Sequence, residues 1–94
     1  MSIAWIVVVH RQVKRAAPKL PKGVRAALVA LIREIEQGGP VRGNWPNYGK
    51  LGQVRHHCHL KKGRPTYVAV WEVLDTARRR VEVVYAGTHE KAPY

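Results

Sequence analysis

A chain of 94 residues is the size of one small domain, and its 46% hydrophobic content excludes a globally disordered protein. Its single cysteine, Cys58, excludes an internal disulfide, so we do not expect a secreted disulfide scaffold. Seventeen Lys and Arg against six Asp and Glu give a formal net charge of +11, which attracts polyanions. We therefore expect a single domain over residues 1–94 with an anionic partner.

The basic charge is unevenly distributed along the chain. No acidic residue precedes Glu34, and none lies between Glu36 and Glu72. A field this one-sided makes nucleic acid the leading class of partner. An acidic protein that masks the basic surface is the second class. A membrane surface is disfavoured, because the basic residues are not gathered on one amphipathic helix.

Residues 3–9 begin the predicted structure. Their sequence, IAWIVVV, is short and β-branched, which predicts a buried strand. The run is too short to span a membrane, and it lacks the basic leader and the cleavage site of a signal peptide. We expect a cytoplasmic protein with no membrane partner.

Two helices are predicted next. Residues 10–19 favour a short helix whose end is disturbed by Pro18. Residues 22–37 carry apolar side chains at helical spacing, and the Gly-Gly-Pro sequence at 38–40 ends this helix. The apolar stripe of the second helix consists of Val24, Leu28, Leu31, Ile32 and Ile35.

The second half of the chain is predicted to be mostly strands. Residues 40–52 are rich in Gly and Pro and indicate a loop with a brief extended segment. Residues 53–60 and 66–74 predict the arms of a hairpin, and residues 81–86 predict a last strand that ends at Gly87.

This order of elements predicts an α+β fold: a small antiparallel β-sheet with two N-terminal helices packed on one face. The first strand has no local partner, so we expect it to join the later strands at the edge of the sheet. We see no internal repeat or linker that would divide the chain.

The 53–60 strand carries the residues most suited to chemistry. Alternation places Cys58 and Leu60 on the core face, which turns Arg55, His57 and His59 outward in one row. The following turn places more basic residues at the hairpin tip, and the sheet can bring His89 close to this row. The candidates for binding phosphate are Arg55, Lys61, Lys62, Arg64 and Lys91.

Histidines among cations suit the cleavage of RNA. Neighbouring positive charge lowers the pKa of a histidine, so one ring can serve as a base near neutral pH while another serves as an acid. Lys and Arg can stabilise the charge that develops on a phosphate. Bases, acids and cations with no carboxylate nearby suit this reaction, in which the RNA supplies its own nucleophile, the 2′-OH. No metal or other cofactor is needed if the protein supplies the acid, the base and the cation.

Other interpretations of the same residues stand beside this one. A zinc site is disfavoured, because adjacent strand residues point apart and only His57 and His59 could chelate together. His10 and His56 are expected to be packed or solvated. The basic turn at residues 61–64 could be only a solvated surface. Trp5 and Trp71 are expected in the core, whereas Trp45 and Tyr48 either stack on a base or cap the edge of the core.

Three segments carry a resemblance to a known family. GPVRGNWPNYGKLG, CHLKKGRPTYVAVWEV and VEVVYAGTHEKAPY, together with the preceding helix pair, resemble the RelE/ParE superfamily of bacterial toxin–antitoxin systems, RelE-like branch. The resemblance implies a compact α+β toxin, monomeric when free, that a cognate antitoxin wraps and neutralises. It further implies an mRNA interferase: a metal-independent endoribonuclease that enters the ribosome, cuts mRNA and inhibits translation.

The resemblance also implies roles for particular residues. His57 and His59 occupy the strand row that holds catalytic Lys in one branch of the superfamily, and His89 falls where members carry a catalytic Arg or His. Tyr94 falls near a terminal Tyr that stacks on substrate or assists transfer, and Arg64 stands in for a phosphate-binding Arg. The C-terminal segment is then a working edge, in which Gly87 lets the strand turn, rather than a frayed end.

Two alternatives remain open at this point. One is a ParE-like inhibitor of DNA gyrase, which has the same fold and no nuclease activity. The clustered histidines argue against it, because that function does not need them. The other is a non-catalytic RNA-binding module, which would bind RNA and leave it intact.

Overall fold

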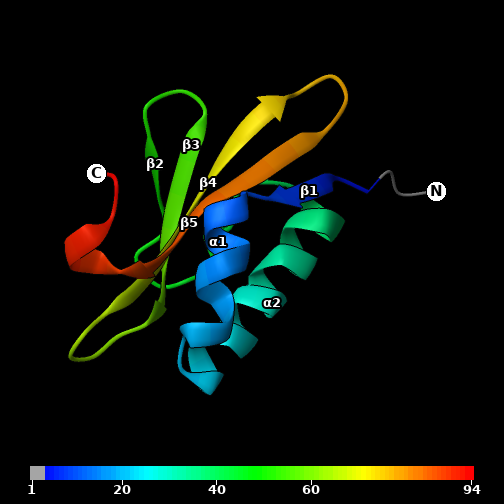
Figure 1. Cartoon of the computed structure of the whole chain (residues 1–94). Coiled ribbons are helices and arrows are strands. Elements are labelled where there is room, and N and C mark those ends of the chain that lie inside the picture. The colour runs from blue at the N-terminus through cyan, green and yellow to red at the C-terminus, as the bar shows by residue number, and fades with distance from the viewer. Residues whose placement is uncertain (1–3) are drawn as a thin grey trace.

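The computed structural model describes residues 4–94, in which two α-helices pack on a five-stranded sheet (Figure 1). This arrangement confirms the predicted α+β class. The elements in chain order are β1 (Ile6–Val9), α1 (Arg11–Ala16), the 3-10 helix η1 (Ala17–Lys19), α2 (Lys22–Gly38), β2 (Gly49–Leu51), β3 (Arg55–Lys61), β4 (Tyr67–Asp75), β5 (Arg80–Thr88) and the 3-10 helix η2 (His89–Lys91).

The strands lie in the order β1-β5-β4-β3-β2. β2 to β5 form an antiparallel meander, as predicted, and β1 lies at the edge, as predicted. However, β1 runs parallel to β5, so the sheet is mixed rather than wholly antiparallel. Both helices lie between β1 and the other strands in the sequence. The direction of β1 is therefore set by long-range packing and not by a local turn.

β1 is shorter and more exposed than predicted. It begins at Ile6, and residue 3 lies outside the described residues. Ile6 and Val8 are 50% and 44% exposed, whereas Val7 and Val9 pack against the core. The expectation of a fully buried strand is therefore wrong, because an edge strand covered on one face leaves every second side chain in solvent.

The two helices cover the same face of the sheet. Four residues of the predicted stripe of α2 are fully or almost fully buried: Val24, Leu28, Leu31 and Ile35. Val13 of α1 belongs to the same core cluster, together with Trp71 of β4. The chain leaves α2 at Gly39, whose φ of 92° favours glycine and whose backbone lies against the indole of Trp5.

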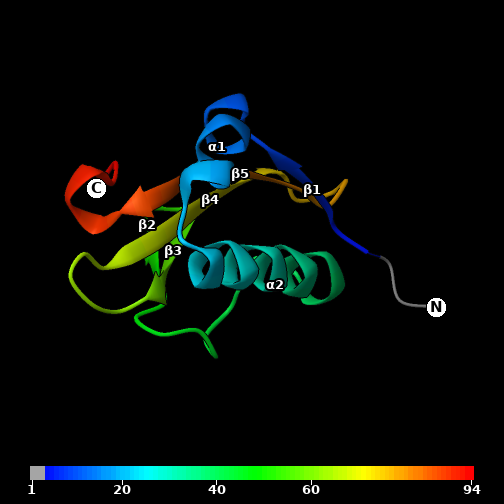
Figure 2. The same ribbon diagram turned by 60° about the horizontal axis from the view of Figure 1, so that its bottom comes forward.

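The face of the sheet that points away from the helices is also buried near its centre. Val68 and Val70 of β4 are fully buried there, although they point away from the helices. In the strand register, His59 lies beside Val68 and His57 beside Val70. The C-terminal turn lies at the end of the molecule away from the start of β1 (Figure 2). This second face is where the histidine row meets the end of the chain.

Gly87 does not end the last strand. β5 continues to Thr88, and Gly87 pairs with Val68 inside the sheet. The hydroxyl of Tyr85 donates to the carbonyl of Thr88 at 2.7 Å, and a Cβ on Gly87 would lie 2.8 Å from that hydroxyl. The predicted turn at Gly87 is therefore wrong, and the glycine instead makes room for a side chain two residues earlier.

Candidate active site

β3 presents its residues as the alternation predicts. Cys58 and Leu60 are buried in the core, whereas His57 and His59 lie on the other face of the sheet. Burial raises the pKa of the Cys58 thiol to about 12, so this cysteine is not a reactive nucleophile. The groups of β3 that remain candidates for proton transfer are therefore His57 and His59 on its outer face.

The end of the chain folds back onto this row. The backbone N–H of His89 donates to the carbonyl of Thr66 at 2.8 Å, which ties η2 to the β3–β4 hairpin. The ring of His89 lies 6.1 Å from that of His59 and 5.7 Å from that of Tyr94, between centroids. Tyr94 in turn lies 4.9 Å from His57. The four residues predicted to be catalytic are thus brought together.

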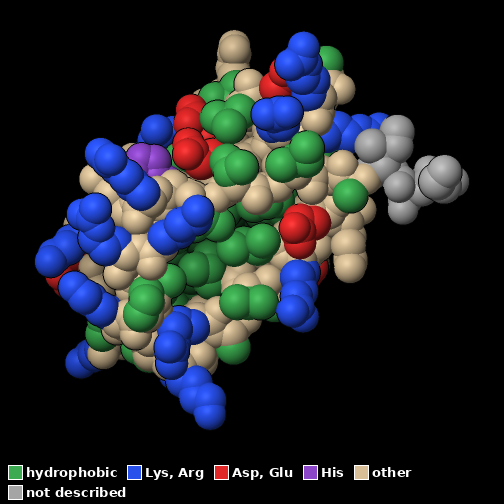
Figure 3. Space-filling view, turned by 45° about the vertical axis from the view of Figure 1, so that its right-hand side comes forward, with side chains coloured by type: hydrophobic (Ala, Val, Ile, Leu, Met, Phe, Trp, Pro, Cys, Tyr) green, Lys and Arg blue, Asp and Glu red, His purple; other side chains and the backbone are tan. Residues whose placement is uncertain are grey.

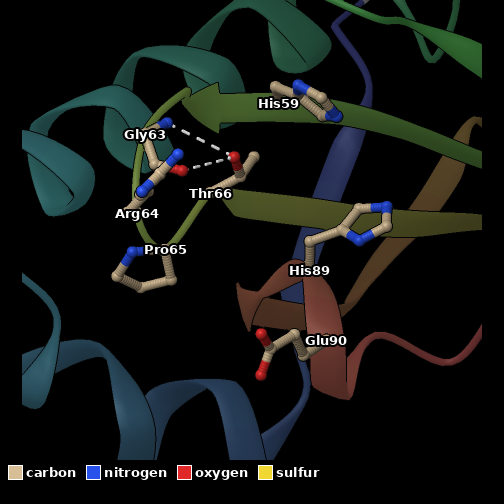
Figure 4. Close-up of a pocket in the computed structure, with 7 residues that line it drawn as sticks. All are labelled: His59, Gly63, Arg64, Pro65, Thr66, His89 and Glu90. Atoms are coloured by element: carbon tan, nitrogen blue, oxygen red, sulfur yellow. Dashed lines mark hydrogen bonds between the residues drawn. The ribbon is translucent and has the colours of Figure 1, made fainter.

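A cavity of about 600 Å³ opens beside the rings of His59 and His89. Figure 4 shows Arg64 and the turn on one side of it and the two histidine rings on the other. The turn is fixed by Thr66, whose hydroxyl donates to the carbonyl of Gly63 at 3.0 Å. The lining residues are His59, Gly63, Arg64, Pro65, Thr66, His89 and Glu90.

Glu90 corrects one expectation about this site. The sequence indicated a cluster of bases and cations without a carboxylate nearby. The short helix η2 carries Glu90 directly after His89, and both side chains line the same cavity. The site therefore combines histidines and Arg64 with one negative charge at its wall.

The predicted phosphate-binding residues differ in their surroundings. Arg64 lines the cavity, and Lys62 adds the smallest of three effects, after burial and the charge of His89, that lower the pKa of His59. Arg55 instead forms an ion pair with Glu72 across the sheet, with 3.6 Å between Nε and Oε1. The Lys61 ammonium lies near Gly23 of α2, on the side of the helices.

Lys91 is exposed in η2, one residue beyond Glu90. Of the five predicted phosphate-binding residues, Arg64 is the one that lines the cavity. Lys62 follows directly after β3, and Lys91 lies in η2 together with His89. Both can therefore add to the positive field around the cavity.

The histidines of the row are tuned mainly by burial. Desolvation lowers the pKa of His57 and of His59, and the neighbouring histidine charges lower both further. Both rings are therefore favoured in their neutral form near neutral pH, as expected, although burial has a larger effect than the cations. Burial also raises the pKa of Tyr94, so this phenol retains its proton.

Asn47 is the functional candidate that the sequence did not reveal. Its Nδ2 lies 3.0 Å from Nε2 of His59. The only local signal was that asparagine tolerates the left-handed backbone that this position adopts, with φ of 54°. Contact between residues 47 and 59 depends on how the 40–48 loop packs, which no local pattern indicates.

The aromatic residues of this loop cap the core. Trp45 donates its indole N–H to Glu34 at 3.0 Å, and the hydroxyl of Tyr48 bonds to Nδ1 of His56 at 2.7 Å. His56 is 3% exposed and stacks on Trp71, so it is packed, as predicted. These contacts favour a structural role for both aromatic residues over stacking on a base.

Within residues 4–94, no group of three or more His, Cys, Asp or Glu is arranged to hold a metal ion. Nδ1 of His57 is buried without a hydrogen-bond partner, and its Nε2 lies against Gly49.

In the part of the chain that the structure describes, no helix is long and apolar enough to cross a membrane.

A second surface lies on the helical side. A groove of about 420 Å³ runs between α1 and α2, lined mainly by apolar side chains with Lys14 and Arg25 at its rim. Val29 in this groove is 49% exposed. Figure 3 shows hydrophobic side chains gathered in a hollow on one face, with Lys and Arg around it.

Comparison with known proteins identifies the fold. No protein family profile matches the chain, and no curated protein sequence matches it. Three solved structures do. A free mutant of the E. coli toxin RelE has 21% sequence identity and a TM-score of 0.67, with 95% of this chain and 87% of that chain covered.

Two further structures agree with the first. The RelE–RelB complex of Pyrococcus horikoshii has 16% identity and a TM-score of 0.68, over 98% of this chain and 100% of that chain. The isolated E. coli RelE toxin has 20% identity and a TM-score of 0.67, over 96% and 89%. The chain is thus an α+β protein with the fold of the RelE toxins, as its sequence motifs indicated.

Proposed function

We propose that this protein is the toxin of a toxin–antitoxin pair and that it cuts messenger RNA on the ribosome. The observation that carries the proposal is the meeting of four rings, those of His57, His59, His89 and Tyr94, where His59 and His89 line an open cavity. A gyrase inhibitor has no use for proton-transfer groups gathered in this way. The likeness to RelE toxins supports the same class.

The proposed reaction uses the RNA as its own nucleophile. The 2′-OH attacks the adjacent phosphorus, so a 2′-O–P bond forms and the bond from phosphorus to the 5′-oxygen breaks. One group takes the proton from the 2′-OH, and another gives a proton to the departing 5′-oxygen. The products are a 2′,3′-cyclic phosphate and a 5′-hydroxyl.

The residues divide this work by their positions. His89 is exposed and lines the cavity, so we assign one proton transfer to it. His59 and Tyr94 both contact the ring of His89 and supply the other proton transfer and a hydrogen bond to the phosphate. Arg64 stabilises the charge that develops on the phosphate oxygens. His57, half-buried under Tyr94, supports the phenol ring from below.

The net charge of +11 supports a ribosomal target. Lys and Arg that neutralise phosphates release counterions, so affinity for ribosomal RNA should fall steeply with salt. We propose a cytoplasmic protein that is monomeric when free. Its antitoxin is expected to carry acidic residues beside an apolar segment, which would suit the basic rim and apolar floor of the groove between α1 and α2.

Cleavage in a purified translation reaction, mapped by primer extension, tests this proposal. Wild type should cut mRNA only when ribosomes are present, and His89→Ala should not cut. His10→Asn is the matched control. His10 caps the N-terminus of α1, far in sequence from His89, and asparagine also caps helices. Cutting by folded His89→Ala at the wild-type rate would remove His89 from the mechanism.

Intact mRNA in every lane would overturn the nuclease assignment. Inhibition of gyrase supercoiling by the same protein would then establish the ParE-like alternative, and RNA binding without either activity would establish a binding module. The partner is tested separately in cells. Expression should arrest growth, and co-expression of the gene adjacent on the chromosome should relieve the arrest.

A further inference from the structure

Asn47 engages one ring nitrogen of His59. Its amide nitrogen, Nδ2, is 3.0 Å from Nε2 of His59. An amide nitrogen can only donate, so Nε2 accepts and the neutral ring carries its proton on Nδ1. Resting on the RNA cleavage proposed above, we propose that Asn47 is a positioning residue that holds His59 in this tautomer. His59 then acts as a hydrogen-bond donor to the scissile phosphate and not as the base.

The backbone places Asn47 against His59 directly. The N–H of His59 donates to the carbonyl of Pro46 at 2.8 Å, so the residue before Asn47 is tied to the residue it positions. Asn47 itself adopts φ of 54°, in the left-handed region that asparagine tolerates better than most residues. This conformation turns the chain so that the amide faces β3.

The rest of the loop is anchored to α2 through one carboxylate. Oε1 of Glu34 accepts from Nδ2 of Asn44 at 2.8 Å, from the indole of Trp45 at 3.0 Å and from Arg42 at 3.5 Å. These hydrogen bonds lower the pKa of Glu34, so its carboxylate remains charged. Asn47 is therefore held on a braced loop that keeps its amide at a fixed distance from His59.

The contact decides what His59 can do. A nitrogen lone pair that already accepts from Asn47 is not free to take a proton from the 2′-OH. A protonated ring would place an N–H against the amide N–H, so the contact disfavours the charged form. Among the described residues, no protein group hydrogen-bonds to Nδ1 of His59, which leaves that N–H available to a phosphate oxygen.

The surroundings of His59 act in the same direction. Burial lowers the pKa of His59, and the charges of His89 and Lys62 lower it further. The titratable and charged groups around the ring are His57 on β3, Lys62 and Arg64 in the turn, and His89 and Glu90 on η2. A neutral imidazole that donates a hydrogen bond can stabilise developing negative charge without transferring a proton. The two proton transfers then fall to His89 and Tyr94.

The tautomer can be measured without any assay of function. Long-range proton–nitrogen spectra of the histidine rings, recorded with the rings neutral, should show the proton of wild-type His59 on Nδ1. Asn47→Gly should shift the ring toward the tautomer protonated on Nε2, and glycine keeps the left-handed backbone without strain. Asn47→Asp replaces the donor by an acceptor, so it should place the proton on Nε2 and raise the pKa of His59.

Gln53→Ala is the matched control, because it removes an exposed side-chain amide from the turn between β2 and β3, which takes no part in bracing the loop. Its His59 tautomer should equal that of wild type. Wild-type His59 protonated on Nε2, or a tautomer that Asn47→Gly leaves unchanged, would overturn the proposal. This readout stands whether or not the protein cuts RNA.

Kinetics then connect the tautomer to cleavage. In the translation reaction, Asn47→Gly should lower kcat about 10- to 100-fold with KM nearly unchanged, by analogy with the effect of removing partners that orient metal-bound histidines. The pH profile should shift to higher pH. An unchanged kcat in Asn47→Gly would overturn the role of Asn47, whereas failure of wild type to cut would overturn the proposed function instead.

Discussion

The ring of Tyr94 lies over the ring of His57, with 4.9 Å between centroids and planes inclined by 36°. The Nε2 end of the same imidazole lies against Gly49 of β2. His57 therefore lies between the end of the chain and the edge of the sheet. Its pKa and position depend on both neighbours, and each can be changed separately.

Removing the tyrosine ring should change the titration of His57. Burial is the largest cause of its lowered pKa, so Tyr94→Ala should raise that pKa toward the ordinary value of 6.5. NMR titration of the histidine rings measures this directly. His56 serves as an internal control, because Tyr48 and Trp71 contact it instead of Tyr94. An unchanged pKa of His57 in Tyr94→Ala would show that Tyr94 does not shield this ring.

Adding one methyl group at Gly49 should displace His57. A Cβ there would lie 2.9 Å from Nε2 of His57, closer than real side chains approach. We expect Gly49→Ala to lower the free energy of unfolding by about 1–3 kcal/mol, the usual cost of overpacking. Gly43→Ala is the matched control, because a Cβ at Gly43 meets nothing within 4 Å. Equal urea midpoints for the two variants would contradict the close contact at Gly49.

Two arginines should contribute unequally to RNA binding. Arg64 lines the cavity, whereas Arg55 is already paired with Glu72. Arg64→Ala should weaken binding and reduce the slope of log K against log salt by about one, as expected for one lost phosphate contact. Arg55→Ala should leave the slope nearly unchanged. Binding of a short single-stranded RNA across a salt series provides the measurement, and the reverse order of effects would refute the assignment.

Stability should fall when the solution is acidified. Burial lowers the folded-state pKa of His56 and His57 below their unfolded value of 6.5, so the unfolded chain binds more protons in acid. The stabilisation is complete above the unfolded pKa and is lost as the pH falls through the folded pKa. Urea midpoints should therefore decrease from neutral to mildly acidic pH at constant salt.

A variant without one of these groups provides the control for that experiment. His56→Phe keeps an aromatic ring beside Trp71 but removes a titrating nitrogen. The urea midpoint of this variant should therefore decrease less on acidification than that of wild type. A midpoint that stays flat in wild type would show that the buried histidines do not govern the pH dependence.

Local sequence pattern predicted much of this protein. The spacing of Val24, Leu28, Leu31 and Ile35 predicted the buried face of α2, because a helix repeats its side-chain direction every 3.6 residues. The alternation around Cys58 predicted that His57 and His59 lie outward, because strand residues alternate between faces. Both periodicities are properties of the backbone, so they can be read before the fold is known.

The sequence by itself determined the α+β class, the outward histidine row and the basic charge, since each follows from local periodicity or composition. Only the tertiary structure decided that β1 runs parallel to β5, that Glu90 enters the cavity and that Asn47 reaches His59. These contacts join residues far apart in the chain or depend on how a short helix is turned. The free energy that stabilises these contacts comes from the packing of the whole domain, which no local pattern encodes.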